Sequence, residues 1–266
     1  MNEATLTLFA GTINYQGDLK PNSFTINHSN FTASLIYRKP LNRWLSWRLG
    51  AGMGQIEGAD RYNRDYLKPR NLSFYTDLKE INTALELTMF DLAAWKFTPY
   101  VYGGIALYHF NPWTYDANGK KVFLKPLSTE GQGFTIKPYA LTQIAIPFGA
   151  GVKYALNDCM NIGIEFSQRK TFTDYLDDVS SYFVDQNLLL QQRGPLAVQL
   201  AFRGDELPGG RSYPREGTIR GTPSEMDWYY FLGATFEMKF SCFKNMSSHK
   251  GKKHLAYNPN RCPSAK

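Results

Sequence analysis

The sequence predicts an all-β protein, an eight-stranded antiparallel transmembrane β-barrel with long extracellular loops and a periplasmic C-terminal tail. Eight segments alternate between apolar residues and small or polar residues, with the period of two that is typical of β-strands. All of them exceed the five or six residues usual in soluble sheets and suit a tilted membrane strand of roughly 9–11 residues. Short turns and long loops also alternate between them, as in bacterial outer-membrane barrels.

The eight expected strands cover residues 5–15, 30–38, 44–57, 78–90, 99–110, 139–154, 161–172 and 228–240. The last strand alternates most clearly, because large apolar residues from Trp228 to Phe240 are separated by residues that turn polar toward Glu237. In 139–154, Ile146 and its apolar alternates face away from a small or polar set, which a narrow barrel of about eight strands needs inside. One such strand could belong to a soluble sandwich, but the repetition favours the barrel.

The connections between the expected strands differ in length in a regular way. Short joints at 39–43, 91–96 and 155–160 alternate with long ones at 16–29, 58–74, 111–138 and 173–227. In the usual orientation of bacterial barrels the short turns and both termini face the periplasm, and the long loops face outward. We therefore expect a protein of the bacterial outer membrane.

The composition agrees with this interpretation. No run of about 18 or more apolar residues occurs in the sequence, which excludes a transmembrane helix. Aromatic residues make up 15% of the chain, and many lie near expected strand ends, where membrane barrels carry interfacial girdles. The 266 residues divide into a barrel, residues 1–240, and a tail, residues 241–266. Because residues 1–4 lead directly into the first strand without a secretory signal, we expect the sequence of a mature or recombinant form.

The net charge of +7 is concentrated in the tail. Residues 241–266 contain six basic residues and no acidic ones, so the barrel and its loops are close to neutral. A basic run is often only a solvated tail, and the alternative is a docking segment for a periplasmic partner or for anionic headgroups. The candidate docking residues are Lys244, Lys250, Lys252, Lys253, Tyr257 and Arg261.

The three cysteines, Cys159, Cys242 and Cys262, are all expected on the periplasmic side, where disulfides form. A Cys242–Cys262 bond would close a loop on the tail, but Cys159 in the expected turn is a third candidate, so the pairing stays open. Nucleic acid is not an expected partner in that compartment.

Ionisable residues on the inner face of the barrel need partners, because an unpaired charge in a narrow interior is costly. Candidates for a lumen network of ion pairs are Arg48, Glu57, Glu86, Lys153, Glu165, Arg169 and Glu237. Eight strands leave almost no free bore, so a packed, ion-paired plug is favoured over an ion or solute path.

Two loop motifs and two strand segments carry a resemblance to known proteins. They are HFNP at 109–112 with PLSTEGQG at 126–133, RKTFTDYLDDVS at 169–180, IPFGAGVKY at 146–154 and DWY at 227–229. Together they resemble a family of Bacteroidetes outer-membrane β-barrels that includes PorG, the outer-membrane component of the type IX secretion system. The resemblance extends from NYQGDL at 14–19 to the tail at 262–263, and so covers nearly the whole chain. It is specific to the family and less so to PorG.

The resemblance implies a non-catalytic outer-membrane component of the type IX secretion machinery that anchors a periplasmic ring of the PorK and PorN type. The short turns and the basic tail would then be the contact surface, and outer-membrane lipid and lipopolysaccharide would surround the barrel. No cofactor and no small-molecule substrate are expected. The alternative is a small outer-membrane barrel of structural, porin-like or ligand-binding role unrelated to secretion.

The acidic loop residues Asp174, Asp177 and Asp178, with Glu130 in the other motif, raise the question of a metal site, since hard cations bind several carboxylates. The run lacks EF-hand spacing and glycine, so we expect a structural loop network, and cation binding stays open. The same loop holds arginines that could pair with the run, Arg193, Arg203, Arg211, Arg215 and Arg220.

Catalysis is not expected. The sequence contains no Gly-x-Ser-x-Gly motif and no paired histidine spacing typical of metal ligands. His109 lies beside Phe110 at an expected strand end, where we expect it to form a hydrogen bond with a loop.

Overall fold

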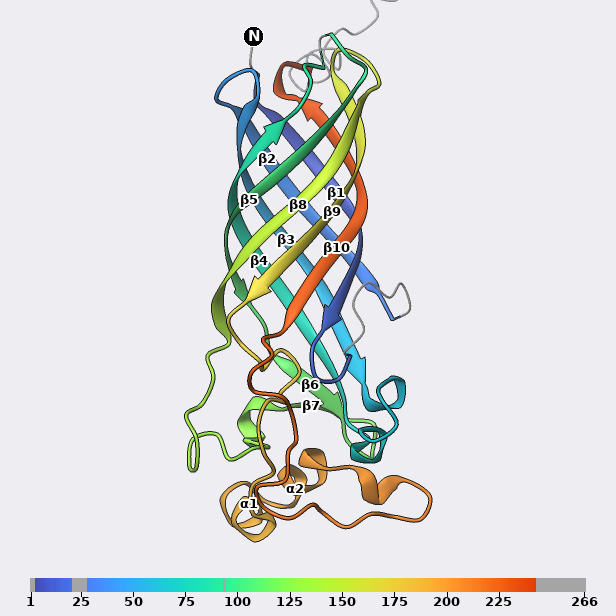
Figure 1. Ribbon diagram of the computed structural model, residues 1–266, viewed down its shortest axis with the longest axis vertical. Coiled ribbons are helices and arrows are strands. Elements are labelled where there is room, and N and C mark those ends of the chain that lie inside the picture. Colours follow the sequence, from blue (N-terminus) through green and yellow to red (C-terminus); the bar gives the residue numbers. More distant parts are fainter. Residues whose placement is uncertain (1–2, 21–27, 93, 243–266) are drawn as a thin grey trace, which may run out of the picture.

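The computed structural model of the chain describes residues 3–20, 28–92 and 94–242. Eight long strands form the barrel: β1 (Thr5–Gln16), β2 (Asn30–Pro40), β3 (Leu45–Ala59), β4 (Ser73–Thr88), β5 (Phe97–His109), β8 (Thr142–Ala155), β9 (Met160–Thr171) and β10 (Trp228–Lys239). Each pairs antiparallel with its neighbours in the order β3-β2-β1-β10-β9-β8-β5-β4, and β3 pairs with β4 to close the ring (Figure 1). The expected closed, eight-stranded antiparallel barrel is confirmed.

The register follows the alternation in the sequence. Along β10, the side chain of Phe236 is exposed on the outer face, whereas those of Thr235 and Glu237 are buried inside. On β8, Ile146 is 42% exposed and its cross-strand neighbour Lys170 also lies on the outer face. The expected orientation of these residues is confirmed, because a slip of one residue would have turned every side chain to the opposite face.

Glycines on the inner face make room for the large side chains that fill the barrel. A Cβ atom at Gly151 would lie 2.5 Å from the ring of Tyr100, and one at Gly149 would lie 2.8 Å from the ring of Tyr102. Both tyrosine rings are buried on the inner face of the neighbouring strand β5. The small residues of β8 therefore allow the tyrosine rings of β5 to fill the interior.

One end of the barrel carries the short turns at 41–44, 89–96 and 156–159, and we call it the short-turn end. The beginning of β1 and the end of β10 lie at this end too, since Thr5 pairs with Lys239 (Figure 1). Two of these turns are stabilised in the same way. The side-chain oxygens of Asn42 and Asn157 each accept hydrogen bonds from the backbone amides two and three residues later.

The opposite end is covered by a loop cap, formed by residues 17–20, 60–72, 110–141 and 172–227 (Figure 1). Strand β4 begins at Ser73, five residues before the expected start at 78, because its first residues continue the pairing with β3 and, at Tyr75 and Thr76, also pair with β6 (Pro112–Tyr115). Strand β6 in turn pairs with β7 (Lys121–Phe123), a small hairpin that the alternation did not predict. Short 3-10 helices complete these loops, at Asp60–Tyr62, Lys68–Arg70, Lys125–Leu127 and Gly204–Glu206.

Two helices that we did not expect lie in the longest connection, α1 (Gln186–Arg193) and α2 (Pro195–Ala201). The carboxylate of Asp185 accepts a hydrogen bond from the amide of Leu188 and so caps α1, and Pro195 occupies the first position of α2. Among the residues that the structure describes, no helix is long and apolar enough to cross a membrane.

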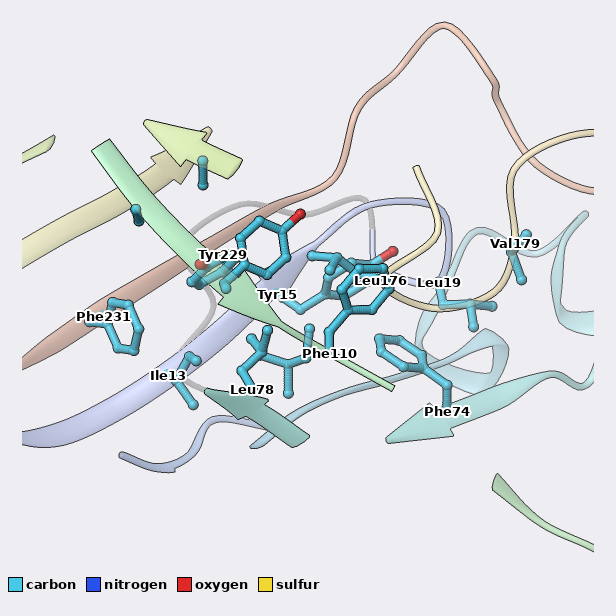
Figure 2. Close-up of a cluster of buried hydrophobic side chains, with 14 of the residues drawn as sticks. Ile13, Tyr15, Leu19, Phe74, Leu78, Phe110, Leu176, Val179, Tyr229 and Phe231 are labelled. Atoms are coloured by element: carbon cyan, nitrogen blue, oxygen red, sulfur yellow. The ribbon is translucent and has the colours of Figure 1, made fainter. Parts of the chain in front are cut away.

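The main hydrophobic cluster lies where the barrel meets the loop cap. Ile13, Leu78 and Phe231 reach it from strands, and Leu19 and Leu176 reach it from the cap (Figure 2). The cap is therefore attached to the barrel by a shared apolar core, rather than by surface contacts alone.

Candidate functional site

The interior of the barrel near the short-turn end holds a network of ion pairs. Glu86 is central to it: its carboxylate accepts hydrogen bonds from Arg38 (2.8 Å), Lys153 (2.6 Å) and Arg48 (3.1 Å). Glu165 is bound by the guanidinium of Arg48, with two nitrogen–oxygen distances of 3.1 Å. All five side chains are almost completely buried.

Further groups complete the network. The carboxylate of Glu237 lies 3.0 Å from Arg38 and 3.3 Å from Lys153. Arg169 does not reach Glu165 but binds Glu80 at 3.0 Å. The network thus contains four carboxylates and four cations, which balance its charge: Glu80, Glu86, Glu165 and Glu237 with Arg38, Arg48, Lys153 and Arg169.

Tyrosine hydroxyls add further hydrogen bonds to the lumen carboxylates. Those of Tyr100 and Tyr102 donate to Glu165 at 2.6 and 2.9 Å, and that of Tyr229 donates to Glu80 at 2.8 Å. Each charged group is paired and shielded from solvent, although one nitrogen each of Arg38 and Arg48 is buried without a hydrogen bond, and together they form a packed plug. A void of about 10 Å³ borders the network, at Arg48, Glu165 and Arg169. It is about the size needed for one water molecule.

The structure brings together six of the seven predicted lumen residues, Arg48, Glu86, Lys153, Glu165, Arg169 and Glu237. Glu57 was wrongly expected among them. It occupies the outer face of β3, on the same parity as Leu49 and Met53, and its carboxylate lies 3.7 Å from His28 at the loop end.

Sequence reasoning missed Arg38 and Glu80. Both lie on the inner parity of strands that the alternation identified, since Arg38 follows Ile36 on β2 and Glu80 precedes Glu86 on β4 by six residues. Alternate residues of a strand point to the same face, so assigning every charged residue of each strand to the inner or outer face would have found both.

The two loop motifs lie against each other in the loop cap. Asp178 accepts hydrogen bonds from the hydroxyls of Thr129 (2.5 Å) and Tyr139 (2.6 Å). Glu130 accepts hydrogen bonds from the backbone amides of Ser180 and Ser181 and binds the guanidinium of Arg220 at 2.8 Å. Long loops with such specific contacts form a defined structure.

The other acidic residues of the cap gather where β1 enters it. The Tyr15 hydroxyl lies 2.6 Å from Asp177 and 3.0 Å from Asp227, and both carboxylates are buried. Asp227 also accepts a hydrogen bond from the amide of Leu176, and Asp177 accepts one from Val179. Asp174 is only 4% exposed, and neither of its carboxylate oxygens has a well-formed hydrogen bond within the described structure, where only the Ser180 side chain approaches as a donor.

Within the described structure, the arginines that could have paired with this acidic run form no ion pair with it. The Arg220 guanidinium donates to Glu130 and to the backbone carbonyl of Asp178, Arg193 donates to the Ser128 hydroxyl, and Arg203 binds Glu206. Hydroxyl and amide donors reach the aspartates instead, because the loop places Tyr15, Tyr139 and nearby amides closer to them.

Burial of these carboxyl groups raises their pKa values. Burial, reinforced by the negative charges of Asp177 and Asp18, raises the pKa of Asp174 to about 10. Burial also raises the pKa values of Asp177 and Asp227 well above the ordinary range. The pKa of Asp178 rises only to about 6, because Arg220 and two hydroxyl donors offset the effect of burial.

Within the described part of the chain, no three histidine, cysteine, aspartate or glutamate side chains have the spacing of a metal site.

His109 hydrogen-bonds Thr142 across neighbouring strands, at 2.9 Å, on the outer face of the barrel. This differs from the loop contact that we expected, since Thr142 begins β8.

At the short-turn end, Cys159 and Cys242 form a disulfide, with a Cα–Cα distance of 6.0 Å. It joins the turn between β8 and β9 to the chain just beyond β10. Ser241 beside it contacts the carboxylate of Glu3. The candidate docking residues of the tail, Lys244, Lys250, Lys252, Lys253, Tyr257 and Arg261, lie outside the described residues, as does Cys262.

Solved structures with some similarity to this chain include small barrels. Neisserial surface protein A is 11% identical, with 89% of this chain and 97% of that chain covered and a TM-score of 0.45. The outer membrane protein OprG from Pseudomonas aeruginosa is 10% identical, with 90% and 97% covered and a TM-score of 0.43. Ail, the attachment invasion locus protein of Yersinia pestis, is 8% identical, with 89% and 99% covered and a TM-score of 0.40.

No curated protein matches the sequence. A family model described as "Domain of unknown function (DUF6089)" matches residues 2–198. Because this match spans well over half of the 266 residues, the chain belongs to the family defined by that domain.

Proposed function

We propose that the protein is a non-catalytic β-barrel of the bacterial outer membrane, with outer-membrane lipid and lipopolysaccharide around it, that anchors a periplasmic assembly. The observation that carries the proposal is its apolar outer face. Every barrel strand contributes at least one large, exposed apolar side chain: Leu8, Leu35, Met53, Ile81, Ile105, Ile144, Ile164 and Leu232. An apolar band around a whole barrel is costly in water and suits hydrocarbon, in which a closed barrel leaves no unpaired strand edge.

The filled lumen supports an anchoring role rather than a transport role. The side chains of Arg38, Glu86 and Glu165 are at most 3% exposed, although they lie in the middle of the barrel. A continuous water path would expose them. The packed interior therefore favours a protein whose working surfaces are its two ends.

The short-turn end is the surface that we assign to the periplasmic partner. The Cys159–Cys242 disulfide fixes the chain to this end immediately before residues 243–266, which carry the basic residues of the tail. A strongly basic segment held at one end of a barrel attracts an acidic partner at a defined place, and salt weakens that attraction. Disulfides persist in the oxidising periplasm.

We further propose that the partner is the periplasmic ring of the type IX secretion system, of the PorK and PorN type. Support for this finer assignment comes from the motifs at 126–133 and 169–180, whose resemblance led to it. These motifs pack together in the loop cap through Thr129, Glu130 and Asp178. They therefore stabilise the loop cap, and the surfaces that remain for contact with the partner are the short turns and the tail.

The experiment is affinity purification of the tagged protein from native envelopes, with mass spectrometry of the proteins that accompany it. One variant ends after Cys242, which keeps the disulfide, and a second changes Lys250, Lys252 and Lys253 to Glu. Both should insert normally and lose the ring proteins. A control variant reverses three exposed charges of the loop cap, Lys120, Lys137 and Arg211.

The control should retain the ring proteins at the wild-type level. Undiminished recovery from both tail variants would overturn the docking role of the tail and move the contact to the short turns at 41–44, 89–96 and 156–159. Recovery of no envelope partner by the wild-type protein would overturn the anchoring proposal itself.

A further inference from the structure

A cluster of carboxyl groups lies at the base of the loop cap, and no cation of the described residues forms an ion pair with it. Asp174, Asp177 and Asp227 are each at least 96% buried, and Asp18 is half-buried beside them. Arg70 and Arg220 are the cations whose charge reaches the cluster. Each is bound to a carboxylate of its own, Arg70 to Asp60 at 2.6 Å and Arg220 to Glu130 at 2.8 Å.

Hydrogen-bond geometry indicates that the cluster holds at least one proton. The Tyr15 hydroxyl lies 2.6 Å from Asp177 and 3.0 Å from Asp227. A hydroxyl has one proton to donate, so it can donate to only one of these carboxylates. The other contact is a hydrogen bond only if that carboxyl is protonated and donates to the tyrosine oxygen.

Asp174 requires a further neutralising charge. Both of its oxygens are buried and lack a well-formed hydrogen bond in the described structure, since the Ser180 side chain makes at most a weak contact with them. An ionised carboxylate in that position would be far more costly than a neutral carboxyl group, particularly near Asp177 and Asp18.

We propose that Asp174, Asp177 and Asp227, together with the Tyr15 hydroxyl, form a shared proton-binding site that holds the loop cap closed on the barrel, and that the cap opens as these protons are lost. This inference concerns the cap alone and does not depend on the function proposed for the short-turn end.

The cluster can control the cap because it joins segments that are distant in the sequence. Asp177 accepts a hydrogen bond from the amide of Leu19, and Asp227 accepts one from that of Leu176. These two leucines also belong to the apolar cluster between barrel and cap (Figure 2). When the carboxyl groups ionise together, their repulsion acts at the contact between barrel and cap.

Other titratable and charged groups surround the cluster. Tyr108 faces it from β5, and Tyr139 and Tyr175 stack on each other at 4.6 Å in the cap. The charged groups that face it are Asp18 and Lys20 from residues 17–20, Asp60 and Arg70 from residues 60–72, Glu130 from residues 110–141, and Asp178 and Arg220 from residues 172–227. Arg70 and Arg220 stay charged throughout, whereas burial lowers the pKa of Lys20 to about 8 and raises that of Asp178 to about 6. These two groups also titrate as the pH rises, so the comparison with Asp174→Asn isolates the contribution of the cluster.

The test is hydrogen–deuterium exchange of the full-length protein in detergent micelles, followed in peptides covering 15–20 and 174–184 and corrected for the intrinsic pH dependence of exchange. Raising the pH from about 6 to about 9 should lower the ratio of closed to open cap up to tenfold per pH unit for each proton lost on opening. Asp174→Asn, which stays neutral, should reduce the pH dependence of this ratio by the equivalent of about one proton, that is, by up to tenfold per pH unit. Asp205→Asn, an exposed residue of the same loop, should leave it unchanged.

Protection that is independent of pH in the wild type, or an unchanged pH dependence in Asp174→Asn, would overturn the proposal. Infrared spectroscopy of the wild type provides a second readout if the variant does not fold. It should show protonated carboxyl groups at neutral pH that ionise as the cap opens, and their absence would also overturn the proposal. Loss of protection on adding a calcium chelator at neutral pH would assign the site to a metal cation and contradict proton binding.

Discussion

Replacing Glu165 with Gln removes one negative charge from the centre of the lumen with almost no change in shape. The wild-type carboxylate binds the Arg48 guanidinium through both of its oxygens and lies 3.5 Å from that of Arg38. It also accepts hydrogen bonds from Tyr100 and Tyr102. The amide oxygen of Gln can still accept one of these bonds, but the amide nitrogen turns a donor toward groups that are donors themselves.

The magnitude follows from charge balance. The network has four carboxylates and four cations, so the variant leaves one buried positive charge without a counter-ion. Removing one partner from a buried ion pair costs roughly 3–5 kcal/mol, because the remaining charge stays desolvated. We therefore expect Glu165→Gln to lower the free energy of unfolding by about that amount.

The assay is reversible urea unfolding of the barrel in lipid vesicles. Asp77→Asn is the matched control, because Asp77 is an exposed barrel carboxylate that lies 3.4 Å from Lys121, and a surface pair of this kind contributes about 0–1 kcal/mol. The double variant Glu165→Leu with Arg48→Met removes both charges and should cost less than Glu165→Gln. A loss below about 1 kcal/mol for Glu165→Gln would refute the charge-balanced plug.

Three further predictions concern the outer face, the disulfide and the cap. Ile146→Arg should cost roughly 2–4 kcal/mol in vesicle unfolding, because it places a charge on the lipid face, whereas the buried Thr235→Ser should change little. The double change of Cys159 and Cys242 to Ser should lower stability by about 2–4 kcal/mol under oxidising conditions only, since the bond closes a long loop of 83 residues. Burial raises the pKa of Asp178 to about 6, so its contribution to cap stability is full below about pH 4 and lost as the pH rises through 6. That loss is roughly 3 kcal/mol, and Asp178→Asn should abolish it in cap unfolding measured at pH 4 and pH 7.

The barrel could be predicted from the sequence because its strands obey a local rule. Alternation assigns each residue of β8 or β10 to one face, and the lumen residues then follow from parity. The same rule contradicts the placement of Glu57 in the lumen, so that error lay in applying the rule. The early start of β4 at Ser73 was missed, although residues 73–77 pair with the barrel strand β3, because on their other side they meet the loop hairpin strand β6, which the alternation did not predict.

The loop cap was less predictable because its order comes from contacts across long sequence distances. Tyr15 meets Asp177 and Asp227 across 162 and 212 residues, and no local pattern links them. The helices α1 and α2 did carry a local signal, in Asp185 as N-cap and Pro195 at the first helical position. The run of acidic residues allowed arginine partners, and the fold supplies hydroxyl and amide donors instead.

The central claim is that the barrel crosses the outer membrane with its loop cap outside and its short turns in the periplasm. The direct measurement labels single cysteines in intact cells with a membrane-impermeant maleimide. Ala117→Cys lies in the loop cap and Ala94→Cys in a short turn, both at exposed positions, and Cys262→Ser removes the cysteine outside the disulfide. We predict labelling at residue 117 in intact cells and at residue 94 only after the outer membrane is opened. Labelling at 94 in intact cells, or at neither position before opening, would contradict the account.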